Sequence, residues 1–283
     1  MMSVERPVVF DCDGEKLVGI FHAGKAGVKQ AVVVVVGGPQ YRIGSHRQFV
    51  IMARALAAAG TPVFRFDYRG MGDSTGEIRS FERVESDIRA AVDCMIRDDP
   101  EIEQVVLLGL CDAASAILMY LPSDNRVSRV ILLNPWVHTE AGEAKVYLKN
   151  YYLRRIFQKT FWQKVVSGGF DVMRSFRDAV KVVKALRADS RLDANDSQRA
   201  TSFIDLMRDG LRAFDGPVLT LISGRDLTAS QFMELLRSDN DWRRLSSRSN
   251  FHLINLPAAD HTMSRREDLN RACDSIIEWL DES

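Results

Sequence analysis

The chain has 283 residues, with 38 Lys and Arg against 38 Asp and Glu, so its formal net charge is zero. A balanced charge supplies no general field to attract nucleic acid, and we therefore exclude a nucleic-acid-binding protein. Hydrophobic residues make up 46% of the chain and charged residues 27%. This is the composition of an ordinary folded protein rather than of a disordered or disulfide-held one.

The cysteines are few and scattered along the chain. Cys12, Cys94, Cys111 and Cys273 form no CxxC pair and lie at no metal-ligand spacing from a histidine. This pattern predicts reduced thiols, a cytoplasmic location, no metal site and no cofactor. The longest aliphatic run, residues 31–36, is far shorter than a membrane span, so no transmembrane segment is expected.

Short β-branched runs alternate with helix-length amphipathic stretches, which predicts an α/β fold with a mostly parallel sheet of about eight strands flanked by helices. The expected sheet opens with an antiparallel pair around the turn at Asp13 and Gly14. The later runs are continuous rather than alternating, as is typical of strands buried on both faces. The expected strands are residues 7–10, 16–21, 31–36, 62–66, 104–108, 127–133, 217–222 and 251–256.

Helix boundaries are predicted from local signals. Ser45, Thr228 and Ser264 are each followed three residues later by Gln or Glu, which indicates three capping boxes at helix starts. Gly60 follows an alanine run and is expected to end the first covering helix in the left-handed conformation. Apolar residues at helical spacing from Leu269 onwards predict a closing helix packed on the sheet.

The alternation is interrupted between residues 136 and 214, where no strand is expected. Residues 145–187 of this insertion hold 11 Lys and Arg and 2 Asp and Glu, a local excess of 11 − 2 = +9. We predict a helical lid inserted between two parts of one core, residues 1–135 and 215–283. Its basic residues either bind an anionic part of the substrate or solvate helix exteriors, and the sequence favours neither. The residues concerned are Lys149, Arg154, Arg155, Lys159 and Lys164.

The most informative segment, residues 105–115, reads VVLLGLCDAAS. A hydrophobic strand runs through Gly109 into Cys111, and a helix-forming run begins after it, with the small Ala113 on the far side. This is the pattern of a nucleophile elbow, in which bulk at either flanking position would clash, with cysteine in place of serine. The following helix N-terminus favours a thiolate and a developing oxyanion. We therefore predict Cys111 as the nucleophile.

Partners for a nucleophile follow later in the chain. Asp226 comes just after the strand at 217–222, and His261 comes after the last strand. The order of nucleophile, acid and histidine is that of α/β-hydrolases, so His261 is predicted to take the Cys111 proton and Asp226 to orient His261. Asp260 is a poorer acid because neighbouring side chains point apart. Ser115 reads as a helix residue, and His22, His138 and His252 lack a comparable context.

Two glycine-rich loops fit the same fold. The segment after the third strand is expected to supply half of an oxyanion hole, and since Pro39 has no N–H, the predicted donors are the N–H groups of Gln40 and Asp112. The loop DYRGMGDS at 67–74 is interpreted as structural, with glycines that adopt unusual backbone angles.

Three motifs together resemble one family. GGPQYRIGSHRQF at 37–49, the elbow GLCDAAS and LNPWV at 133–137 are similar to the exosortase A system-associated hydrolase 1 family. The resemblance covers nearly the whole chain. It implies an α/β-hydrolase fold, hydrolase membership and a genomic setting beside bacterial exosortase and exopolysaccharide genes. It implies no substrate.

The predicted function is cleavage of an ester or thioester through an acyl-cysteine intermediate. Two alternatives stay open, namely acyl transfer through the same intermediate and a non-catalytic protein that binds an acyl or glycolipid ligand. The expected partner is a small-molecule or carrier-linked acyl substrate with an apolar part and an anionic part, and no nucleic-acid partner is expected. A third reading makes the basic insertion a dock for a membrane or an acidic carrier protein. His46, Arg47 and Trp136 are candidate substrate contacts, and the oligomeric state is left open.

Overall fold

The computed structural model describes residues 4–37, 40–137 and 202–282. The predicted lid and its excess of Lys and Arg fall largely on residues 138–201 and lie outside the described residues. His138 and Pro39 lie outside them as well. In the part of the chain that is described, no helix is both long and apolar enough to cross a membrane.

Eight strands form one sheet in the order β1-β2-β4-β3-β5-β6-β7-β8. β1 and β2 are antiparallel and turn at Asp13 and Gly14, both of which have positive φ, and β2 pairs antiparallel with β4. All other neighbours are parallel, which confirms the predicted α/β fold with a mostly parallel sheet of eight strands. The strands are β1 Glu5–Cys12, β2 Glu15–His22, β3 Gln30–Val35, β4 Val63–Phe66, β5 Gln104–Leu110, β6 Val127–Leu133, β7 Val218–Ser223 and β8 Phe251–Leu256.

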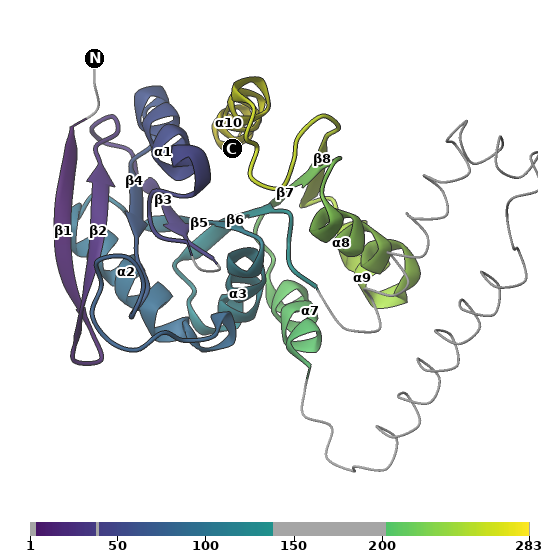
Figure 1. Cartoon of the computed structure of the whole chain (residues 1–283), viewed down its shortest axis with the longest axis horizontal. Coiled ribbons are helices and arrows are strands. Elements are labelled where there is room, and N and C mark those ends of the chain that lie inside the picture. Colours follow the sequence, from purple (N-terminus) through teal and green to yellow (C-terminus); the bar gives the residue numbers. More distant parts are fainter. Residues whose placement is uncertain (1–3, 38–39, 138–201, 283) are drawn as a thin grey trace, which may run out of the picture. The chain divides into compact units, whose positions relative to one another are not determined.

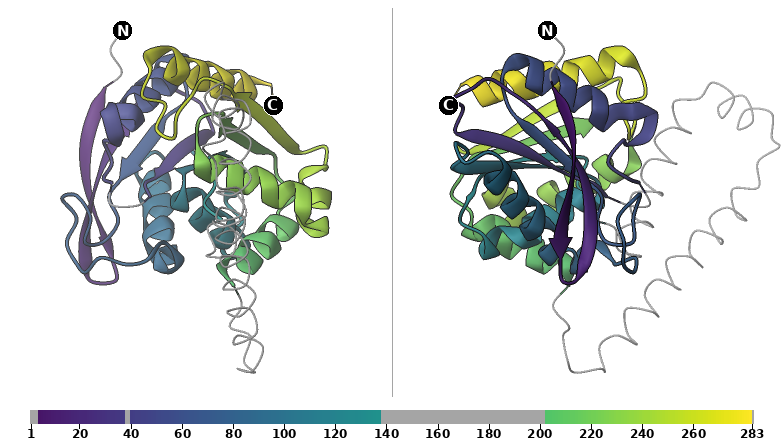
Figure 2. Two further views of the ribbon diagram at one scale, coloured as in Figure 1. Left: turned by 45° about the vertical axis from the view of Figure 1, so that its right-hand side comes forward. Right: turned by 90° about the vertical axis from the view of Figure 1, so that its left-hand side faces the viewer.

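Helices cover both faces of this sheet (Figure 1). α1 and α10 lie on one face, and α2, α3, α7, α8 and α9 lie on the other, an arrangement that Figure 2 shows from two further sides. The helices are α1 Gln48–Ala59, α2 Glu85–Asp98, α3 Asp112–Tyr120, α7 Phe203–Ala213, α8 Leu227–Ser238, α9 Asn240–Ser246 and α10 Arg266–Asp281. Short 3-10 turns occur at Ser45–Arg47, Phe81–Arg83 and Leu121–Ser123.

The central strands divide their side chains between two apolar layers. In β3, Val33 and Val35 pack with α2 and α3, whereas Val32 and Val34 pack with α1 and α10. Because successive residues of a strand point to opposite faces, a run of valines fills both layers at once. β8 is an exception, since it lies at the sheet edge and its residues are mostly half-buried or exposed. The expectation of continuous burial therefore holds for the inner strands only.

The three predicted capping boxes are wrong. The N-caps of α1 and α10 are Arg47 and Arg265, and neither side chain caps its helix. α8 begins one residue before Thr228, and Asp226 caps it by accepting from two backbone N–H groups. In each case the box motif lies near the helix, but the backbone turns into the helix at another residue. Gly60 does end α1 in the left-handed conformation, with φ of 115°.

Helix α7 packs closely against α3. A Cβ added at Gly210 would lie 1.8 Å from the carbonyl oxygen of Leu118, so only glycine permits this approach. α7 therefore belongs to the same compact unit as the sheet, although its residues fall inside the range 136–214 that the sequence assigns to the insertion.

Candidate active site

Cys111 occupies a strained turn between β5 and α3. Its φ is 62° and its ψ is −125°, a conformation that non-glycine residues rarely adopt. The surrounding backbone enforces it, because Cys111 N donates to Leu133 O over 2.9 Å and Cys111 O accepts from Ala114 N at 3.0 Å and Trp136 N at 3.1 Å. Strain of this kind is held where the neighbouring structure over-determines the backbone, as in a nucleophile elbow.

Steric crowding explains why a glycine precedes the elbow. A Cβ added at Gly109 would lie 2.7 Å from Ile117 Cδ1 and 2.8 Å from the backbone of Ala113 and Ala114. Such distances are far inside van der Waals contact, so the first turn of α3 passes directly over Gly109. The sequence interpretation of this position therefore agrees with the geometry.

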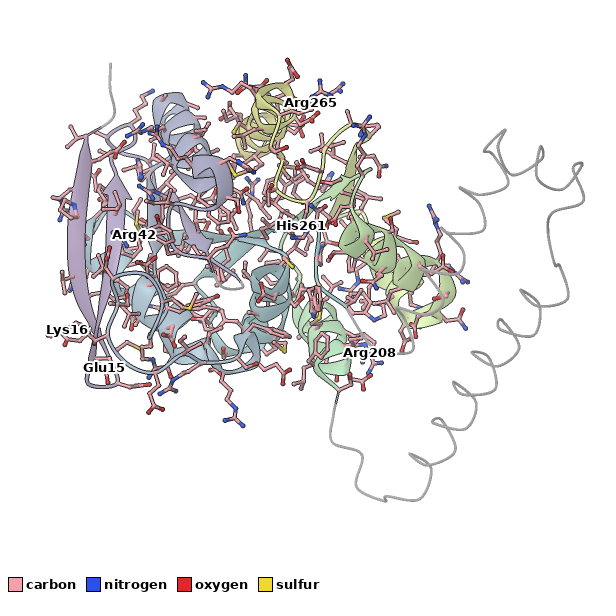
Figure 3. The ribbon with its side chains drawn as sticks, viewed as in Figure 1. Glu15, Lys16, Arg42, Arg208, His261 and Arg265 are labelled. Carbon is pink, nitrogen blue, oxygen red and sulfur yellow. The ribbon has the colours of Figure 1, made fainter. Side chains whose placement is uncertain are left out.

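His261 lies in the loop between β8 and α10, near the middle of the described unit (Figure 3). Its Nδ1 donates to Asp226 Oδ2 over 2.7 Å. Hydrogen bonds to Asp226 first and to the Cys111 side chain second raise the pKa of His261 to about 10. The structure thus brings together Cys111, His261 and Asp226 from three separate strand ends. Sulfur, imidazole and carboxylate in this order form a relay that can hold and move one proton.

The Asp226 carboxylate is fixed by the start of α8. Oδ1 accepts from Thr228 N and Oδ2 from Ala229 N, each over 3.2 Å. The two bonds make Asp226 the N-cap of α8 and fix its carboxylate beside the imidazole. Asp260, the neighbour of His261 in sequence, instead accepts hydrogen bonds from the backbone N–H and the hydroxyl of Ser264.

The chain just after β3 packs against the start of α3 at Gly37. A Cβ added at Gly37 would lie 2.0 Å from Asp112 Oδ1 and 2.7 Å from Ala113 N. Asp112 Oδ1 also accepts from Ala113 N at 3.0 Å, which turns its side chain back along the helix start. Gln40 follows two residues that lie outside the described part, and its buried Oε1 makes no hydrogen bond to the described residues.

Arg42 anchors the segment that carries Gln40. Its backbone N–H donates to Asp67 Oδ1 over 2.6 Å, and its guanidinium pairs with Asp67 and, over 2.5 Å, with Asp73. Asp67 is fully buried in the loop at 67–74, where Gly70 and Gly72 have φ of 73° and 53°. This loop therefore holds Arg42 and the residues beside it in place.

The three candidate substrate contacts are His46, Arg47 and Trp136, and they differ in their exposure and in their contacts. His46 and Arg47 are exposed, and both have positive φ, 54° and 62°. The charge of His46 helps to lower the pKa of Asp260, after the larger effect of Ser264, so His46 lies on the side of the His261 loop. Trp136 is half-buried, and its backbone N–H bonds the carbonyl of Cys111.

Two buried residues beside the elbow have contacts that sequence reasoning missed. Ser115 donates to Trp136 O over 2.5 Å. Asn134 is fully buried and bonds both Ser223 and the backbone of His261. The only signal for Asn134 was its place after an expected strand within a motif quoted for the family resemblance. In the described ranges, no group of three or more His, Cys, Asp or Glu is arranged to hold a metal ion.

Sequence comparison decides the family. Residues 27–238 match the family model described as serine aminopeptidase, S33. The chain belongs to this family. It is accordingly an α/β-hydrolase, although its elbow carries Cys111 where the family description names a serine. A search of curated proteins finds no match.

Solved structures of hydrolases share the fold. A Pyrococcus furiosus esterase, PF2001, superposes with a TM-score of 0.66 at 15% identity, covering 99% of this chain and 91% of that one. Est1E from Butyrivibrio proteoclasticus, solved with ferulic acid bound, gives 0.62 at 15% identity, covering 97% and 98%. A putative hydrolase from Agrobacterium vitis gives 0.56 at 16% identity and covers 98% of both chains. At these identities the likeness concerns the fold alone.

Proposed function

We propose that this S33-family hydrolase cleaves an ester or thioester with Cys111 as nucleophile, His261 as base and acid, and Asp226 as the group that orients His261. The observation that carries the proposal is the contact of one imidazole with both other groups, with Nδ1 bonded to Asp226 and the ring bonded to the Cys111 side chain. The raised pKa of His261 keeps this imidazole protonated at neutral pH, and an imidazolium beside the sulfur favours a thiolate.

Acylation then follows from these positions. The thiolate of Cys111 attacks the carbonyl carbon, a C–S bond forms, and the carbonyl electron pair moves to the oxygen, where the N–H groups of Gln40 and Asp112 are the proposed donors. The pair returns, the bond to the leaving oxygen or sulfur breaks, and His261 gives its proton to the leaving group. The products are an alcohol or thiol and an acyl-Cys111 thioester.

Deacylation restores the starting state. Neutral His261 takes a proton from water while the water oxygen attacks the thioester carbonyl, and the C–S bond then breaks. The acid leaves, the thiolate of Cys111 is regenerated, and His261 is again protonated. If an amine or a thiol replaces the water, the same steps give acyl transfer, and the sulfur nucleophile favours this second function because thioesters transfer readily to such acceptors.

The substrate class is proposed from the surroundings of the elbow. The backbone of Trp136 bonds that of Cys111, and the 3-10 turn Ser45–Arg47 presents the exposed imidazole of His46 and the cationic guanidinium of Arg47 near the His261 loop. An acyl group with an anionic portion, such as an acyl-CoA or a carrier-bound thioester, suits this combination. We further propose, on the motifs quoted above, that the protein belongs with the exosortase A system-associated hydrolases.

Intact-mass analysis after incubation with p-nitrophenyl acetate or an acyl-CoA tests the proposal. The wild-type protein should gain one acyl group on Cys111, and Cys111→Ala should gain none and lose turnover. Cys94→Ala removes a buried thiol in α2 and is the matched control, with turnover close to wild type.

The outcomes separate the candidate functions. Equal turnover by Cys111→Ala, without an adduct in the wild type, contradicts the mechanism. Product released faster when an amine or thiol is added favours acyl transfer. Tight binding of the acyl-CoA without any turnover, unchanged in His261→Ala, favours a binding protein.

A further inference from the structure

Asn134 lies directly after β6 and joins three parts of the chain. Its side chain is fully buried and its φ is 45°, in the left-handed region. Nδ2 donates to Ser223 Oγ over 2.9 Å and to the backbone carbonyl of His261 over 3.1 Å. Oδ1 accepts from Ser223 N at 2.8 Å. The amide therefore binds the last residue of β7 and the His261 backbone at once.

The donors and acceptors around Asn134 allow one orientation of its amide. Ser223 N–H only donates, so it must face Oδ1, and the carbonyl of His261 only accepts, so it must face Nδ2. Flipping the amide would bring two acceptors together at His261 and two donors together at Ser223. The partners thus hold the buried amide in one orientation, and the amide in turn holds the His261 backbone at a fixed distance from the end of β6.

The backbone on either side of Asn134 holds the elbow. Leu133 O accepts from Cys111 N at 2.9 Å, and Trp136 N donates to Cys111 O over 3.1 Å. The segment 133–136 therefore contacts the Cys111 backbone directly and the His261 backbone through one amide. Ser223 also lies three residues before Asp226. One short segment thus supports the chain at or near all three groups of the proposed mechanism.

We propose that Asn134 is a positioning residue that sets His261 at the correct distance from Cys111 through the hydrogen bond to the His261 carbonyl. The inference rests on the proposed function, and it assigns to Asn134 a role that neither the elbow motif nor the family description contains. Asparagine suits the position because it tolerates the left-handed backbone and supplies both a donor and an acceptor on one rigid group.

Three variants distinguish the effect of the Asn134 side chain from the effect of its backbone conformation. Asn134→Asp keeps the shape and tolerates the left-handed φ, but it replaces the donor facing His261 by an acceptor. Asn134→Gly keeps the backbone conformation and removes every side-chain bond, and it provides a second test if the aspartate variant does not fold. Ser223→Ala is the matched control, since it removes only the Oγ acceptor and leaves the bond to the His261 carbonyl in place.

Two readouts are measured on each variant of the full chain, alongside its melting temperature. The first is turnover of p-nitrophenyl acetate, with kcat and KM determined separately. The second is the rate at which iodoacetamide alkylates Cys111 across pH 5 to 9, followed by peptide mass. Alkylation reports how the imidazole acts on the sulfur, and it requires no substrate.

We expect Asn134→Asp and Asn134→Gly to lose about 10- to 100-fold in kcat while KM changes less than about threefold, because misplaced catalytic groups slow the chemical step. Their plots of alkylation rate against pH should move toward that of an ordinary thiol, which reaches its half-maximal rate at about pH 8.5. Ser223→Ala should lose less than about threefold in kcat on the same reasoning.

A lower melting temperature with wild-type kcat and alkylation profile in both Asn134 variants overturns the inference, since a merely structural residue would behave so. That result leaves the proposed function intact if the wild type forms its acyl adduct. The opposite result is also distinguishable. If the wild type forms no acyl adduct but the Asn134 variants still shift the alkylation profile of Cys111, the positioning role is supported and the proposed function is refuted.

Discussion

Arg65 donates a hydrogen bond from Nε to Nε2 of His22 over 2.8 Å in the buried interior of the chain. Burial first, and the charge of Arg65 second, lower the pKa of His22 to about 4. Glu5, 3.8 Å from His22 Nδ1, opposes this shift, and Arg54 adds to it. His22 is therefore neutral in the folded protein, and its Nε2 is an acceptor.

This pair predicts how stability changes in mild acid. The pKa of His22 is lower in the folded chain than its value of about 6.5 in an unfolded chain, so the contribution is present above about pH 6.5 and is lost as the pH falls toward 4. Between pH 7 and pH 5 the free energy of unfolding should drop by about 2 kcal/mol through this group. Urea unfolding of wild type and His22→Gln checks it, because glutamine accepts from Arg65 but does not titrate. An equal drop in both proteins would contradict the assignment.

Asp226→Asn tests what raises the pKa of His261. The hydrogen bond that His261 donates to Asp226 is the largest cause of that shift, so the variant should lower the pKa of His261 and leave less imidazolium at about pH 8. Alkylation of Cys111 at that pH should then slow by about 10-fold or more, because less imidazolium stands beside the sulfur to favour the reactive thiolate. Asparagine still caps α8, so the fold should persist. Asp260→Asn is the control, and a similar loss there would point to a general charge effect.

Gly109→Ala tests the packing of the elbow. The added Cβ would lie 2.7 Å from Ile117 Cδ1, a side-chain end that can move, and 2.8 Å from the backbone of Ala113 and Ala114 in α3, which cannot move without shifting the helix. We expect a loss of about 1–3 kcal/mol in the free energy of unfolding, together with lower turnover because α3 and Cys111 shift. Chemical denaturation measures the first effect. A variant as stable and active as the wild type would show that the elbow relaxes freely.

Thr220→Val tests an isolated buried hydroxyl. Thr220 lies in β7 with no exposed surface, and its Oγ1 has no hydrogen-bond partner among the described residues. Leaving such a group unpaired costs about 1–3 kcal/mol, so valine of similar shape should raise the free energy of unfolding by roughly 1 kcal/mol. A melting temperature below that of the wild type would mean that the hydroxyl is bonded in solution.

Features that depend on neighbouring residues could be predicted from the sequence. The inner strands, the turn at Asp13 and Gly14 and the end of α1 at Gly60 follow from local pattern. The contact between Asp226 and His261 could also be anticipated, because parallel strand ends meet at one edge of the sheet.

Features set by distant partners could not be predicted. Asn134 bonds residues 89 and 127 positions away, and nothing in its local sequence identifies them. The helix caps failed for a related reason. Asp226 looked like an acid at a strand end, and its second role at the start of α8 depends on where the backbone turns. The exposure of β8 depends on its place at the sheet edge, which strand composition does not encode.

The order of the strands also governs when reactivity arises during synthesis. His261 follows Cys111 by 261 − 111 = 150 residues, and it lies after β8, the strand that pairs with β7. At roughly 5–20 residues per second the ribosome needs about 8–30 s to cover that interval. For this time the nascent chain carries Cys111 without His261. On the proposed mechanism, a chain that terminates before His261 is expected to form no acyl adduct, even where β3, β5 and β6 have already assembled.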